Sequence, residues 1–513
     1  MNDRQRQRDG FAFQKQHARR RGVALFVVML MLSVTIGLTY AMLHAQTHQV
    51  RIQSNANNLN RARQAAMSGL HYALSRMHRS DWVGVDQSVK RKLDSGVSFT
   101  VTFTTGDQSL SVSDSDYEYY PYRVTVESVG SAVDPADPDR TMTATAGLVA
   151  QLIPRAIGPT PSNWSTVTSN TIYQYSASQC EISFPCRIEG SIWLQGQMEF
   201  CPYYYWSVNQ ETGYMADLER MRQSGYYGDH RPFSGPININ WWSQMSYVRD
   251  MLVDDLGLSI NRITASTPSD WTHPGYVYTY RLYPGGKEYS AKRINSSLSN
   301  VSHTPDPKTN PIGLFYVTDP LYVYDNVKIE GTLVGGARYN ADIYFYGDNV
   351  EFKAHDLPAL DGADKPVQLP VAVMADDIRV YDNCDVELKG MVCVWDDFQV
   401  AQDYQYDIRL DVEGIVAMKD LRIDPRYDWR ISDDTWDYLE DHYEDEDYTP
   451  KGGLYYPDWL DRYTYLSYKT SINIAPSGDE VEYGWLQNDE PIYQIGAGDD
   501  GLKWKVLSRS YDW

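Results

Sequence analysis

Motifs of the common enzyme classes are absent from this sequence. It contains no phosphate-binding G-x-x-x-x-G-K-[ST] loop, no G-x-S-x-G nucleophile turn and no H-E-x-x-H zinc pair. Cysteine is also scarce, with five in 513 residues, and no spacing among them matches a zinc site. These absences favour a protein without a catalytic centre, and we expect that it is not an enzyme.

The few cysteines fall into two groups. Cys180, Cys186 and Cys201 lie close together, and in an oxidising compartment one pair of them would close a loop. The sequence leaves open which pair this is. Cys384 and Cys393 have apolar neighbours, and we expect them to be thiols of the core.

Positive charge is scarce over most of the chain. Residues 81–513 hold 34 basic and 66 acidic residues, whereas residues 1–80 hold twelve basic residues and two acidic ones. A protein that binds nucleic acid needs a basic face, so the acidic segment argues against this partner. It fits a solvated surface or the binding of divalent cations.

One uncharged run, residues 23–43, is long enough to cross a bilayer as a helix at ~1.5 Å per residue. The apolar side chains that we expect to face the membrane are those of Val23, Leu25, Phe26, Val27, Leu30, Leu32, Ile36, Leu38 and Leu43. Three arginines, Arg19, Arg20 and Arg21, precede the run, and we expect this end to stay in the cytoplasm. Two alternatives remain open, namely a secretory signal peptide cleaved near Ala41 or Ala45 and a plain signal anchor.

The segment that follows the run continues at helical spacing. Residues 46–77 contain no proline and no acidic residue. Their apolar positions recur every three or four residues and predict one stripe of an amphipathic helix, formed by Leu59, Ala62, Ala66, Leu70, Ala73 and Met77. A membrane helix therefore runs directly into an amphipathic one.

Two stretches of this region carry a family resemblance. Residues 20–28 read Arg-Arg-Gly-Val-Ala-Leu-Phe-Val-Val, and residues 60–74 read Asn-Arg-Ala-Arg-Gln-Ala-Ala-Met-Ser-Gly-Leu-His-Tyr-Ala-Leu. Together they resemble the N-terminus of PilX-type minor pilins of type IV pili and of K-type pseudopilins of type II secretion. The resemblance covers about residues 15–80.

The resemblance implies a basic leader over residues 1–22 and a pilin-like helix over residues 23–80. It also implies cleavage by a prepilin peptidase between Gly22 and Val23, a single-pass position in a bacterial inner membrane, and other pilin-like subunits as partners. Major pilins carry Glu at the fifth mature position, which is Val27 here. This departure fits an accessory subunit.

The next segment predicts a small β domain over residues 81–153. Apolar and polar residues alternate over residues 97–103, 122–126 and 142–146, which indicates half-buried strands. We expect these strands to form an antiparallel sheet that packs on the apolar stripe of the helix. Pro154 to Pro161 mark the boundary of this domain.

A repeat then predicts a right-handed parallel β-helix of five or six coils. Four similar segments each place a glycine between short apolar strands, where we expect a corner of the solenoid, and these glycines are Gly190, Gly331, Gly390 and Gly414. Gly390 and Gly414 are 24 residues apart, which is about one coil. We assign the first coil to residues 162–201, a partly helical insertion or cap to 202–311, the remaining coils to 312–423, and an acidic, Tyr-rich C-terminal cap to 424–513. We expect the strand at residues 502–507 to cover the open end of the solenoid.

A second repeat places polar pairs before the strands at residues 319–323, 348–352, 376–380, 396–400 and 419–423. Equivalent positions of neighbouring coils lie ~4.8 Å apart, so their carboxylates would stack. The acids concerned are Asp376, Asp377, Asp396, Asp397 and Asp420. They could bind Ca²⁺ or form the acid pair of a polysaccharide-cleaving enzyme. Hydrogen bonding to turn backbones is the interpretation that we favour.

These patterns predict a mixed fold, with a pilin-like transmembrane and amphipathic helix, a small antiparallel sheet and a right-handed parallel β-helix with a partly helical insertion. The function that we expect is a membrane-anchored component of a type IV pilus or type II secretion-like assembly. Its β-helix would be displayed in the periplasm or outside the cell for assembly or surface contact, with surface glycans among the contacts. The alternatives are a membrane-tethered carbohydrate-active β-helix enzyme and a structural protein of the cell envelope.

Overall fold

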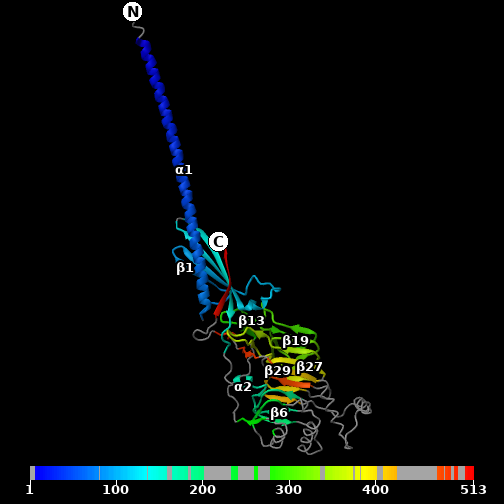
Figure 1. Ribbon diagram of the computed structural model, residues 1–513. Coiled ribbons are helices and arrows are strands. Elements are labelled where there is room, and N and C mark those ends of the chain that lie inside the picture. The colour runs from blue at the N-terminus through cyan, green and yellow to red at the C-terminus, as the bar shows by residue number, and fades with distance from the viewer. Residues whose placement is uncertain are drawn as a thin grey trace, which may run out of the picture.

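The chain folds into a long N-terminal helix, a small antiparallel sheet on the C-terminal half of this helix, and a larger body of short parallel strands (Figure 1). The computed structural model describes the residues 6–79, 81–135, 137–158, 164–182, 186–200, 233–240, 253, 259–263, 278–335, 341–373, 376–381, 383–400, 408–423, 471–478, 480–486, 490–494 and 503–512.

The N-terminal helix, α1 (Arg6–Met77), is continuous over 72 residues, about 108 Å at 1.5 Å per residue. The predicted stripe faces the sheet, because Ala62, Ala66, Leu70, Ala73 and Met77 are buried while Leu59 is half-buried. Small residues allow the close approach of helix and sheet. A Cβ atom on Gly130 would lie 2.0 Å from the carbonyl oxygen of Ala62.

The antiparallel sheet contains the three predicted strands and two more. In spatial order its strands are β1 (Ser88–Asp94), β2 (Val97–Thr105), β3 (Arg123–Asp134), β4 (Asp137–Ile153) and β33 (Lys503–Asp512). A 3₁₀ helix, η1 (Tyr117–Tyr122), precedes β3. Alternate residues of β3 and β4 are buried against α1, as period-two patterning requires.

The position of β33 differs from our expectation of a strand that covers the solenoid's end. It pairs antiparallel with β4, from Lys503 opposite Ile153 to Asp512 opposite Thr145. The indole of Trp504 is buried there, and its Nε1–H donates to the carbonyl oxygen of Met77 at 3.1 Å. The free edge of β4 and this aromatic anchor place the strand on the helix-bound sheet.

The larger body consists of an eight-stranded and a fifteen-stranded sheet, whose strands pair in parallel. In spatial order the eight-stranded sheet contains β15 (Ser297–Leu298), β18 (Leu321–Val323), β21 (Ile343–Phe345), β26 (Ile378–Val380), β28 (Asp397–Val400), β30 (Asp420–Ile423), β6 (Gln179–Ile182) and β9 (Gln197–Phe200).

The fifteen-stranded sheet has two branches that share the bent strands β27 (Cys384–Cys393) and β29 (Ile408–Met418). Besides these strands, the first branch contains β16 (Val301–His303), β19 (Val327–Glu330), β22 (Val350–Lys353), β31 (Ser471–Ala475) and β7 (Arg187–Ile188). The second contains β14 (Lys292–Arg293), β17 (Leu314–Val317), β20 (Thr332–Gly335), β25 (Ala372–Val373), β5 (Ile172–Gln174), β8 (Ile192–Leu194), β10 (Ile237–Ile239) and β11 (Ile260–Arg262).

The remaining elements are short. The helix α2 (Trp164–Thr168) precedes β5, and β12 (Thr279–Arg281) forms a hairpin with β13 (Glu288–Ser290). A three-stranded sheet joins β23 (Asp356–Leu357), β24 (Val367–Gln368) and β32 (Glu482–Tyr483). The interior between the two large sheets is one apolar cluster, to which Ile329, Phe345, Leu388, Phe398 and Val412 contribute.

The order of the strands in space differs from their order in the sequence. We assigned residues 162–201 to the first coil, but β5 pairs with β29, β6 with β30 and β7 with β31. These early strands therefore lie at the end of the body that is far from α1 (Figure 1). The strands that follow in sequence, β14 to β16, lie at the opposite end of the pairing order.

The segment that we assigned to an insertion also contributes strands to the body. Residues 237–239 and 260–262 extend the second branch, and residues 292–303 supply the strands β14, β15 and β16. The helical part that we predicted for this insertion falls on residues outside the described ranges, apart from position 253, and so do residues 424–470 of the predicted acidic C-terminal cap.

The four predicted corner glycines all adopt positive φ, at +85° for Gly190, +135° for Gly331, +127° for Gly390 and +153° for Gly414. Gly390 lies opposite Gly414 in the pairing of β27 with β29. A Cβ atom on Gly414 would lie 2.0 Å from the carbonyl oxygen of Gly390. Glycine is required here because the backbone is left-handed and the neighbouring strand leaves no space for a side chain.

Candidate functional site

The first candidate site is the exposed half of α1. Every apolar side chain that we predicted to face the membrane is exposed, from 45% for Val27 to 66% for Phe26. From Val23 onward this helix is long and apolar enough to span a membrane, with a mean hydropathy of 2.3 in its most apolar window. An apolar surface of this length requires lipid or other helices around it.

Three hydroxyl groups within this half of α1 form hydrogen bonds inside the helix. The hydroxyls of Ser33, Thr35 and Thr39 donate to the carbonyl oxygens four residues earlier, at 2.7 to 2.8 Å. A hydroxyl that is bonded in this way costs little in a hydrocarbon environment. The predicted cleavage position, between Gly22 and Val23, lies within the same continuous helix, and Val23 is 64% exposed.

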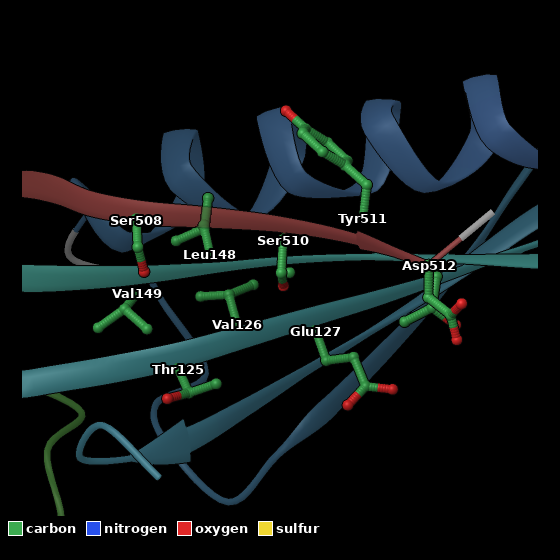
Figure 2. A pocket seen from close by; sticks show the side chains of 11 residues that line it. Thr125, Val126, Glu127, Leu148, Val149, Ser508, Ser510, Tyr511 and Asp512 are labelled. Carbon is green, nitrogen blue, oxygen red and sulfur yellow. The ribbon is translucent and has the colours of Figure 1, made fainter. Parts of the chain in front are cut away.

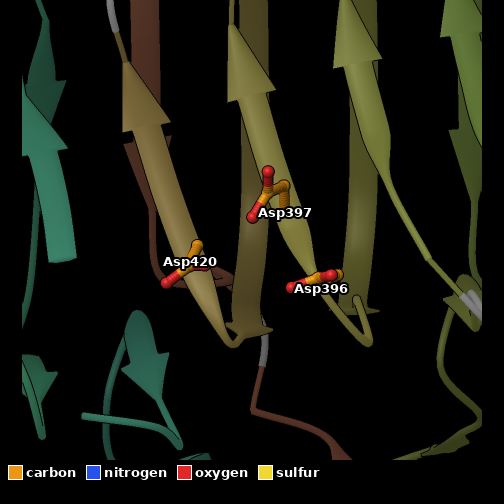
Figure 3. Close-up of side chains that lie close together, drawn as sticks. All are labelled: Asp396, Asp397 and Asp420. Atoms are coloured by element: carbon orange, nitrogen blue, oxygen red, sulfur yellow. The ribbon is translucent and has the colours of Figure 1, made fainter. Parts of the chain in front are cut away.

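The second candidate site is the carboxylate group at one corner of the eight-stranded sheet. Oxygens of Asp396, Asp397 and Asp420 lie within 4.8 Å of one another. Figure 3 shows Asp396 in the turn before β28, Asp397 at the start of β28 and Asp420 at the start of the neighbouring β30. The structure thus brings together three of the five predicted acids, while Asp376 and Asp377 lie outside this group.

The aspartates at the strand starts also hydrogen-bond to backbone groups of the next strand. The Asp397 N–H donates to Oδ1 of Asp377 at 3.1 Å, and the Asp377 N–H donates to Oδ1 of Asp342 at 3.4 Å. Arg379 pairs with Asp377 at 2.6 Å. This geometry is the one that turn-supporting aspartates adopt, which is the interpretation that we favoured from the sequence.

Two aspartates at this corner, Asp397 in the three-carboxylate group and Asp377 beside it, have raised pKa values. Burial, and to a lesser extent the negative charges of Asp377, Asp420 and Asp396, together raise the pKa of Asp397 to about 6. Burial also raises the pKa of Asp377, against the opposing hydrogen bond from Arg379. The Lys419 ammonium contacts Asp396 and neutralises part of the group.

The residues present are a poor fit for Ca²⁺. This ion prefers about six to eight oxygen ligands, and the group offers three carboxylates. Lys419 already lies on one of them, so a bound cation would have to displace an ammonium. We therefore propose no metal-dependent function for this group of carboxylates.

Sequence reasoning missed a stack of tyrosines on the outer face of the eight-stranded sheet. Neighbouring strands carry Tyr322 and Tyr344 with ring centroids 5.2 Å apart, and Tyr324, Tyr346 and Tyr381 continue in a second row at 6.0 and 4.5 Å. Tyr322, Tyr324 and Tyr346 remain 38 to 42% exposed. The signal was the Tyr-x-Tyr spacing at residues 322–324 and 344–346, which recurs with the strands.

A row of asparagines was also missed. Asn300, Asn326, Asn349 and Asn383 all have φ between +51° and +58° and precede the strands of the first branch. The Asn326 amide donates to Asn300 at 2.9 Å, and the Asn349 amide donates to Asn326 at 2.8 Å. We had grouped residues 348–352 with the aspartate turns, but Asn349 belongs to this different corner. Asparagine tolerates the left-handed conformation, and its side chain bonds along the row.

A shallow pocket of about 440 Å³ lies on the outer face of the antiparallel sheet, on the side away from α1 (Figure 2). β3, β4 and β33 line it with hydroxyls and with the carboxylates of Glu127 and Asp512. Its lining contains no histidine, cysteine, lysine or arginine. The pocket can therefore accept and donate hydrogen bonds but lacks a nucleophile–base pair.

The cysteines are buried wherever the structure describes them. Cys186 is a free thiol, and burial raises its pKa to about 12, so it is unreactive at neutral pH. Cys393 is also a buried free thiol, while Cys180 and Cys384 are buried in β6 and β27. Cys201 lies outside the described residues, so a disulfide bond that involves this cysteine is not tested.

In comparisons with known proteins, no family model, no curated protein and no solved structure matches this chain.

Proposed function

We propose that this protein is a pilin-like, membrane-anchored subunit of a type IV pilus or type II secretion-like assembly. The observation that carries the proposal is that α1 is one continuous helix whose two halves have different surroundings. Its first half exposes an apolar surface, and its second half is buried on an antiparallel sheet through Ala62, Ala66, Leu70 and Ala73. A pilin stalk needs both halves, one for the membrane or neighbouring stalks and one for its own head domain.

We also propose that the larger body is a right-handed parallel β-helix. Parallel pairing throughout the two sheets, the row of left-handed glycines and the asparagine row all support this architecture. Right-handed crossovers are the rule for parallel strands, because a twisted strand packs back onto its sheet only in that hand. In this arrangement the body is displayed at the end of the stalk, outside the cytoplasm.

The proposed orientation places the arginine-rich leader in the cytoplasm and the body in the periplasm or outside the cell. Prepilin peptidase would cut between Gly22 and Val23, and other pilin-like subunits would pack against the exposed half of α1. The absence of Glu at position 27 supports an accessory role. The tyrosine stack is the surface that we propose for contact with surface glycans, since aromatic rings and phenol hydroxyls suit polyhydroxylated ligands.

The experiment is N-terminal sequencing of the mature protein from cells with and without prepilin peptidase. We expect a start at Val23 that depends on the peptidase. The variant Gly22→Leu should block the cut, whereas Gly10→Leu, in the same leader, should not. A mature start near Ala45, or an intact leader in the presence of the peptidase, would contradict the proposal.

A second candidate is a membrane-tethered enzyme that cleaves carbohydrates. The three-carboxylate group favours it, because paired acids at about 5 Å are the machinery of retaining glycosidases and Asp397 has the raised pKa of a general acid. Glycan cleavage by the purified protein that is lost in Asp397→Asn and retained in Asp364→Asn, an exposed aspartate elsewhere, would establish it. No cleavage of a polysaccharide panel would exclude it in favour of the pilin-like role.

A further inference from the structure

Two histidines lie on one face of α1 just beyond the apolar run. His44 and His48 are both exposed, and their Nε2 atoms are 2.9 Å apart. Their ring centroids are 4.4 Å apart with an interplanar angle of 87°, and the ring of Tyr40 stacks on His44 at 6.1 Å. Two imidazoles four residues apart on a helix share a face, which is the spacing that zinc-binding helices use.

The distance between the two nitrogens suits a shared metal ion. A tetrahedral Zn²⁺ with Zn–N bonds of about 2.0–2.1 Å holds two ligand nitrogens about 3.3 Å apart. The pair would therefore need to open by about 0.4 Å from the observed 2.9 Å. Small changes in the side-chain torsions of two exposed rings accommodate such a shift without moving the backbone.

The surroundings of the pair determine which ions it can take. α1 has no acidic residue between Val23 and Met77, so no carboxylate contributes, and the nearest charged residue along the helix is Arg51. Ser54, beyond the histidines, donates a hydrogen bond to Asp134 of the sheet at 3.3 Å, and His44 and His48 are exposed among the residues that the structure describes. A site of two imidazoles with open positions favours Zn²⁺, Ni²⁺ or Cu²⁺ over Ca²⁺ and Mg²⁺.

We propose that His44 and His48 form a binding site for a divalent transition metal ion. The two Nε2 atoms are the protein ligands, and water occupies the remaining positions. In the free pair the Nε2–H of one imidazole donates to Nε2 of the other. When the ion binds, that proton moves by way of water to Nδ1 of the same ring, or leaves to water if the ring carried both protons, and the two Nε2 lone pairs replace two water ligands of the ion. The site does not depend on the proposed role in a pilus.

The test is a titration with Zn²⁺, measured by isothermal titration calorimetry. The full chain is used in detergent and is first treated with a chelator to remove bound metal. The control variant combines Gln46→His with His48→Gln, which keeps the ten histidines of the chain but puts the second imidazole on the far side of the helix. We expect this variant to bind Zn²⁺ roughly tenfold or more weakly, because the second ligand no longer chelates the same ion. Circular dichroism should show unchanged helix content, since the positions are exposed.

A rescue variant tests whether Zn²⁺ affinity depends on the spacing of the two imidazoles along the helix. Thr47→His combined with His48→Gln places the imidazoles three residues apart, again on one face, and should restore most of the affinity. Equal Zn²⁺ binding by the wild-type chain and the control variant would overturn the proposal. Failure of the rescue variant to exceed the control would overturn it as well.

Discussion

Replacing Gly414 by alanine tests how tightly the parallel strands stack at their corner. The backbone of Gly414 has φ of +153°, and an added Cβ atom would lie 2.0 Å from the Gly390 carbonyl oxygen. Gly362 provides the matched control, because it also has a positive φ, at +81°, but nothing lies within 4 Å of its Cβ position. Gly362→Ala therefore measures the cost of the left-handed backbone without the steric overlap.

The two variants should differ in how much folding stability they lose. A non-glycine residue in a left-handed conformation costs about 1 kcal/mol in an exposed loop. At Gly414 the overlap with backbone atoms must be relieved by moving β29 against β27, which pair over ten positions. We expect a total loss of about 3–5 kcal/mol there, in the range of overpacking plus backbone strain.

The assay is thermal unfolding of the detergent-solubilised chain, followed by tryptophan fluorescence. A loss of 1 kcal/mol lowers Tm by about 2–4 °C for a body of this size, so Gly414→Ala should lower it by about 10 °C and Gly362→Ala by about 3 °C. If Gly414→Ala is no more destabilising than Gly362→Ala, the stacking of the two glycine corners is refuted.

Three further outcomes are expected for substitutions elsewhere in the protein. Since the pKa of Asp397 is raised to about 6 from an unfolded value near ~3.9, the native state binds more protons between these values and stability falls as pH rises through this window. Asp397→Asn should remove this dependence and raise stability at neutral pH by about 1 kcal/mol after allowance for solvent screening, whereas Asp364→Asn should not. Asn326→Ala should cost about 2 kcal/mol in the thermal assay and Asn326→Gly about 1, because glycine loses the two amide bonds but tolerates the positive φ. Trp504→Ala should cost about 3–5 kcal/mol and speed amide exchange in the buried half of α1, and unchanged exchange would contradict the anchoring role of β33.

Local patterns predicted much of the fold because they act within a few residues. The stripe of Ala62, Ala66, Leu70 and Ala73 depends only on helical periodicity, and it is buried as predicted. The glycines at residues 390 and 414 were identified by their place between short apolar strands, and they have the left-handed backbone that such corners need. The tyrosine and asparagine rows could have been read from the same repeat.

The candidate sites were predictable to a lesser degree. Five aspartates share a sequence context, but only Asp396, Asp397 and Asp420 come together. The Asp377 carboxylate instead accepts a hydrogen bond from the backbone N–H of Asp397 in the next strand. The histidine pair is readable from its spacing alone, yet only the rotamers show that the two nitrogens meet. Burial around Asp397 depends on neighbouring strands and leaves no trace in its own sequence context.

The long helix, its apolar and amphipathic halves, and the alternation of apolar and polar residues in many of the described strands all follow from local sequence patterns. Contacts between distant segments set two further features, namely the stacking of β5, β6 and β7 beyond β29, β30 and β31, and the return of β33 to the antiparallel sheet. Periodicity and turn residues fix the backbone conformation and the buried face of each element. They do not fix which free strand edge an element joins, since every edge offers the same backbone groups and the choice depends on packing between distant segments.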